Sequence, residues 1–182
     1  NADTITTNSL VSPDVPRIIE TLSGGGPHEI QIPQGLSLLE IRIFKMNHDT
    51  ASNPALELFN DGTNQYGSNY KYHYEVQFAD GTVQEETQTN GAVIELAESE
   101  NFSNSKNVPL TVRIGEPTAN DKTGVAWNGG VTKRFSPGTV VGSGYNVTQG
   151  SNGKIRLSAY DGSSINPLNT FSAFVIAYPG DI

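Results

Sequence analysis

The three histidines are the residues in this chain with the widest chemical range, and their spacing predicts no metal centre. His28, His48 and His73 stand in separate segments, and none has the partner spacing of a helical zinc site. Two Asp- and Asn-rich loops, 47–50 and 60–64, lack the ligand spacing of an EF-hand and are typical of turns. The chain has no cysteine, which excludes thiolate metal sites and cysteine nucleophiles. We therefore expect no metal and no cofactor.

The remaining catalytic motifs are incomplete. Gly153 and Lys154 stand as they would in a phosphate-binding loop, but Ile155 replaces the hydroxyl that would hold magnesium. No Gly-x-Ser-x-Gly nucleophile elbow occurs. Glu85 and Glu86 are neighbours in an alternating segment, where paired acids are usually solvated. The sequence thus predicts a protein that is not an enzyme.

Aromatic side chains are the best candidates for binding, because they can stack on sugar rings. The candidate binding residues are Trp127, Tyr66, Tyr70 and Tyr145. A structural interpretation stands beside this one. In the segment Tyr70 to Phe78 the tyrosines share one face with Val76 and Phe78, which favours a packed face, and a single tryptophan commonly anchors a core.

Short β-strands must carry these residues, since no helical period is sustained anywhere and alternating segments recur with turn residues between them. Asp80–Gly81 and Asn90–Gly91 each predict a hairpin. The last two strands are expected at 154–160 and 171–178, the second covered on both faces. About ten short strands predict an all-β fold, an antiparallel β-sandwich of jelly-roll kind.

The domain organisation follows from composition along the chain. Residues 1–16 are rich in Thr and Asn, with two prolines, and are expected to form an extended N-terminal arm. Residues 17–182 are expected to form one β-sandwich domain, which suits a chain of 182 residues. A first residue of Asn rather than Met leads us to expect a processed chain or a fragment.

Charge limits the choice of partners. The net charge is -8 and the pI is about 4.7, so binding to nucleic-acid phosphates or to anionic membranes is not expected. No run approaches the ~18 apolar residues of a membrane span. Charged residues make up only 16% of the chain, which predicts a polar surface built largely from amides and hydroxyls.

Several segments together resemble the C-terminal domain of phage and prophage tail-fibre proteins. The stretches that carry the resemblance are Ile32-Pro33-Gln34-Gly35 before a hydrophobic strand, the loop 49–56, Trp127, Gly153 to Leu157, and Asn169-Thr170-Phe171. The long block from Tyr70 to Leu96 departs from the pattern. The resemblance implies a trimeric, extracellular virion appendage that attaches to a host surface glycan or protein and contacts other virion proteins.

Two other functions remain open at this point. The chain is expected to be a virion attachment protein, with a carbohydrate-binding module or lectin as the alternative. A capsid or decoration protein with the same sandwich is a further alternative.

Overall fold

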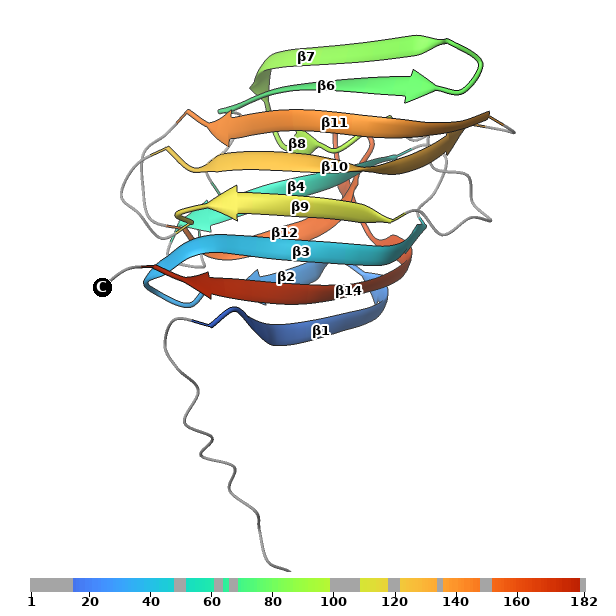
Figure 1. Ribbon diagram of the computed structural model, residues 1–182. Coiled ribbons are helices and arrows are strands. Elements are labelled where there is room, and N and C mark those ends of the chain that lie inside the picture. Colours follow the sequence, from blue (N-terminus) through green and yellow to red (C-terminus); the bar gives the residue numbers. More distant parts are fainter. Residues whose placement is uncertain are drawn as a thin grey trace, which may run out of the picture.

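Two antiparallel sheets packed face to face form the protein, as seen in a computed structural model (Figure 1). The structure describes residues 15–47, 52–60, 64–65, 69–98, 109–117, 122–133, 136–147 and 152–180. Within these residues every regular element is a β-strand. In Figure 1 the larger sheet runs across the front of the molecule and the smaller one lies behind it.

The larger sheet has eight strands, and the smaller has six. The larger contains, in spatial order, β1 (Arg17–Gly26), β14 (Leu168–Pro179), β3 (Leu36–Asn47), β9 (Leu110–Gly115), β10 (Gly124–Lys133), β11 (Ser136–Asn146), β6 (Tyr70–Phe78) and β7 (Val83–Gly91). The smaller contains β13 (Ile165–Asn166), β12 (Asn152–Tyr160), β4 (Asn53–Asn60) and β5 (Asn64–Gln65), with β2 (His28–Gln31) beside β12 and β8 (Ile94–Glu95) beside β4.

The strand order contains a complete jelly roll. The strands β1, β14, β3 and β9 pair in that order in one sheet, and β2, β12, β4 and β8 do so in the other. Numbered along the chain, these eight strands run 1-8-3-6 and 2-7-4-5, which is the double Greek key of a jelly roll. The predicted fold class is therefore confirmed. The hairpins β10–β11 and β6–β7 extend the larger sheet beyond β9.

Alternation of burial explains why these segments form strands. Along β6 every second residue is buried and every intervening one is exposed, so Tyr70, Tyr72 and Tyr74 face inward. In β12, Ile155, Leu157 and Ala159 also lie in the core, and Ser158 on the opposite face is buried as well. The hydrophobic core lies between the two sheets and continues beneath the added hairpins, where Trp127 donates a hydrogen bond to the carbonyl of Leu96.

Strands β10 and β11 form a long hairpin in a glycine-rich part of the chain. Glycines at inward positions leave room for large rings from neighbouring strands. A Cβ on Gly142 would meet the Trp127 ring, and one on Gly144 would lie 2.8 Å from the Cβ of Tyr72. Here glycine serves close packing within a sheet.

The two predicted hairpin turns have different outcomes. Asp80–Gly81 joins β6 to β7, and Gly81 has the positive φ of 86° that the turn requires. The hairpin predicted at Asn90–Gly91 is wrong, because β8 pairs with β4 of the other sheet. The chain crosses between sheets at this point.

The C-terminal strand is central, but it is not covered on both faces as predicted. Strand β14 lies between β1 and β3 and pairs with both along most of its length. Phe171, Ala173 and Val175 point into the core, whereas Phe174 on the opposite face remains exposed. No described helix is long and apolar enough to cross a membrane.

Candidate functional site

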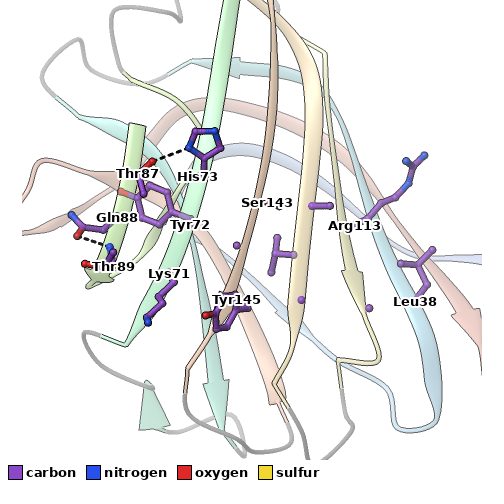
Figure 2. A pocket seen from close by; sticks show the side chains of 15 residues that line it. Leu38, Lys71, Tyr72, His73, Thr87, Gln88, Thr89, Arg113, Ser143 and Tyr145 are labelled. Atoms are coloured by element: carbon purple, nitrogen blue, oxygen red, sulfur yellow. Dashed lines mark hydrogen bonds between the residues drawn. The ribbon is translucent and has the colours of Figure 1, made fainter. Parts of the chain in front are cut away.

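An open groove of about 670 Å³ crosses the outer face of the larger sheet, over strands β3, β9, β10, β11, β6 and β7. Its volume lies within the usual range of small-molecule sites, which is about 300–1,000 Å³. The lining residues on which the site depends are Leu38, Lys71, His73, Arg113, Ala126, Ser143 and Tyr145. Figure 2 shows Tyr145 near the middle, with Lys71 on one side and Arg113 and Leu38 on the other.

Strand register sets the shape of the groove. One row of directly paired residues crosses the sheet, and it consists of Glu40, Arg113, Ala126, Ser143, His73 and Thr87. In this row the long side chains of Arg113 and His73 are separated by the short ones of Ala126 and Ser143. At about 4.8 Å per strand, the two long side chains start about 14 Å apart. The groove is therefore a strip of small residues between two raised sides.

A second row lies beside the first and carries the aromatic residue. Leu38 pairs with Gly115, Gly124 pairs with Tyr145, and Tyr145 pairs with Lys71. The two glycines lack side chains, so the backbone between Leu38 and Tyr145 is open to a ligand. Tyr145 is 38% exposed, and the Nζ atom of Lys122 lies 5.9 Å from its ring centroid. An exposed ring beside a floor without side chains is a suitable surface for stacking.

Hydrogen-bonding side chains stand on both sides of the groove. His73 Nδ1 and Thr87 Oγ1 share a hydrogen bond of 2.8 Å, drawn as a dashed line in Figure 2. Arg113 donates from Nε to Glu40 Oε2 at 2.8 Å, and Arg42 donates to the other oxygen of the same carboxylate at 2.6 Å. In the described part of the chain, the charged side chains that line the groove are Lys71 and Arg113, with no Asp or Glu among them.

The pKa of Glu40 reflects this shared pairing. Burial by itself raises the pKa of this carboxyl, but the hydrogen bonds from Arg113 and Arg42 outweigh burial and hold the pKa below its usual value of 4.5. Glu40 therefore stays ionised and fixes both guanidinium groups. One carboxylate against two arginines leaves this cluster with one net positive charge.

The structure separates the four aromatic residues that the sequence put forward. Tyr145 lines the groove. Trp127 is only 2% exposed and Tyr70 is fully buried, so neither can stack on a ligand from outside, and their assignment as binding residues is corrected. The hydroxyl of Tyr70 bonds to the backbone of Leu58 in the opposite sheet. Tyr66 lies outside the described residues.

Sequence reasoning missed most of the groove residues. Alternation along β6 places Lys71 and His73 on the outer face, but nothing in the sequence placed them beside Tyr145. Arg113 and Ala126 belong to strands whose neighbours only the topology reveals. The one signal for the groove in the sequence was the glycine-rich segment before Tyr145, which contains Gly142 and Gly144.

Carboxyl side chains are absent from the described residues that line the groove. General acid and base catalysis of glycosidic cleavage needs two of them across a cleft. In the described parts of the chain, no three His, Cys, Asp or Glu side chains are grouped to hold a metal ion. The predicted Asp- and Asn-rich loops and His48 fall largely outside the described residues.

Fold and site together define a jelly-roll sandwich that carries an open groove with basic and hydroxyl side chains on its larger sheet. Searches of family models, curated proteins and solved structures found no match to the chain.

Proposed function

We propose that this protein is a non-enzymatic attachment protein of a bacteriophage virion, part of a tail fibre or similar appendage. It assembles as a homo-oligomer outside the cell and contacts a host-surface glycan through the groove that holds Tyr145. The observation that carries the proposal is this groove: an exposed aromatic ring beside a glycine floor, with hydrogen-bond donors on both sides. Sugar rings are bound in this way, by stacking and by directed hydrogen bonds.

A separate apolar strip supports self-association. The strip consists of Ile18 (57% exposed) on β1, Phe174 (37%) on β14 and Phe44 (46%) on β3. These three strands are neighbours in the larger sheet. The two phenylalanine rings contact each other edge to face, with centroids 4.9 Å apart. Monomeric proteins rarely expose clusters of large apolar side chains. Contact between copies through this strip, which spans β1, β14 and β3, would remove the strip from water and leave open the groove, which extends from β3 across the sheet to β7.

A glycan array tests the recognition part of the proposal. Tyr145→Ala should lose the array signal of the wild-type chain while keeping its circular dichroism spectrum. Val141→Ala is the matched control, because Val141 is exposed on the same strand and does not line the groove. Equal binding by wild type and Tyr145→Ala, or no signal on any glycan, would contradict recognition through this groove.

Two further measurements test the virion part. Light scattering should give a mass that is a multiple of 19.5 kDa, and three copies would match the expected trimer. Antibodies against the chain, viewed by electron microscopy on virus particles, should label the appendages. Labelling of the shell would favour the capsid or decoration protein. Glycan binding by a chain that labels no particle would favour the free lectin.

A further inference from the structure

The geometry points to an acidic saccharide as the ligand of the groove, meaning a sugar chain that carries carboxylate or sulfate groups. This inference rests on the proposed function and narrows its ligand class. It depends on the distribution of charge over the molecule and on the two basic residues at opposite sides of the groove.

The groove is positively charged on a negatively charged protein. The whole chain has 19 acidic residues against 11 basic ones, yet the described residues that line the groove include Lys71, Arg113 and His73 and no acid. A neutral sugar needs no such arrangement, because hydroxyls are bound equally well by amides and by carboxylates. A local excess of cations in an acidic chain favours an anionic ligand.

Arg113 is held in position and still has donors to offer. Its only recorded partner among the described residues is Glu40, which accepts from Nε and so occupies one of the five guanidinium N–H groups. The guanidinium side chain is more than half exposed, whereas the Glu40 side chain is 3% exposed. An anchored guanidinium with free terminal nitrogens can bind a carboxylate or sulfate through two hydrogen bonds.

Lys71 provides the second charge on the other side. It is exposed, lies next to Tyr145 in the adjoining strand, and has no recorded ion pair with the described residues. The register places it three strands away from Arg113, or about 14 Å across the sheet at the usual strand spacing. A chain of several sugar units, with acidic groups on separate units, would reach both Lys71 and Arg113 while one ring stacks on Tyr145.

An array that displays neutral, uronate-bearing, sialylated and sulfated glycans tests the inference. Wild-type protein should bind acidic glycans only, and their signals should weaken as salt is raised. For the strongest glycan, calorimetry compares the native form with one whose acidic groups are methylated or removed. We expect that neutral form to bind at least 10-fold more weakly. Lys71→Gln and Arg113→Gln should each weaken binding of the acidic form about 5-fold.

The variants are chosen so that folding is preserved. Arg42 still pairs with Glu40 when Arg113 is replaced, so the buried carboxylate keeps a partner. Lys45→Gln removes the same charge from an exposed site at the other end of β3 and should bind as wild type does. Arg113→Lys separates charge from geometry, because lysine keeps the charge but loses the two-pronged contact.

The outcomes distinguish this inference from the proposed function. Binding that requires Tyr145 but is equal for acidic and neutral glycans would overturn the acidic ligand and leave glycan attachment standing. So would acidic binding that Lys71→Gln and Arg113→Gln leave unchanged. Absence of binding to every glycan would overturn both. The array also distinguishes the two acidic groups. Signal on uronate-bearing or sialylated glycans would identify a carboxylate ligand, and signal on sulfated glycans would identify a sulfate ligand.

Discussion

Replacing Gly142 by alanine should destabilise the protein strongly, although both residues are small. A Cβ at position 142 would lie 2.7 Å from the Trp127 Nε1 atom and closer still to carbons of the same ring. Trp127 is buried, and its Nε1 donates to the Leu96 carbonyl at 2.8 Å. The ring can make room only by moving away from that carbonyl.

The size of the effect has two sources. Overpacking a core typically costs about 1–3 kcal/mol, and leaving the buried Nε1 or the Leu96 carbonyl without its partner costs about 1–3 kcal/mol more. We expect Gly142→Ala to lower the free energy of unfolding by about 4 kcal/mol, a large share of the ~5–15 kcal/mol of an ordinary domain.

Urea unfolding followed by circular dichroism measures this effect and allows a matched control. Gly115→Ala introduces the same methyl group on the same sheet, where nothing lies within 4 Å, so its effect should be small or slightly stabilising. A second variant combines Gly142→Ala with Trp127→Phe. Because the phenylalanine ring is smaller, the double variant should be more stable than the sum of the two single changes predicts. Equal stability of Gly142→Ala and Gly115→Ala would refute the packing explanation. So would a double variant less stable than the sum of the two single changes.

Three other predictions concern buried polar groups. Arg156→Met should lower the free energy of unfolding in urea by about 3–5 kcal/mol, because it removes the bidentate partner of the fully buried Glu57; a change below ~1 kcal/mol would contradict this account. Tyr70→Phe should lower the free energy of unfolding by about 1–3 kcal/mol, because the Leu58 amide loses the hydroxyl to which it donates at 2.8 Å. Hydrogen exchange at the Leu58 amide should become faster, and unchanged exchange would speak against this account. The pKa of Glu40 is lowered in the folded state, so the stability it contributes is present above pH 4.5 and is lost as the pH falls through its folded pKa. Glu40→Gln should therefore flatten the acid side of a plot of melting temperature against pH, and an identical slope in both proteins would show that Glu40 is not responsible.

The sequence by itself determined the fold class and the facing of individual strands. Alternation in Tyr70 to Phe78 and in Lys154 to Tyr160 identified the inward residues correctly, because burial on one face of a sheet imposes a period of two. The Asp80–Gly81 turn was equally local, since its backbone conformation depends on the glycine. The absence of cysteine from the sequence excluded thiolate chemistry.

Only the tertiary structure decided which strands are neighbours, and with them the groove. Arg113, Ser143 and His73 are far apart in sequence and become one row through the register of strands β9, β10, β11 and β6. The fate of the aromatic residues was also non-local. Trp127 is buried because glycines on the adjoining strand make room for its ring, and Tyr145 is exposed because its strand position falls on the outer face. Sequence periodicity reports the face of a strand, but the partner across the sheet is set by packing of the whole domain.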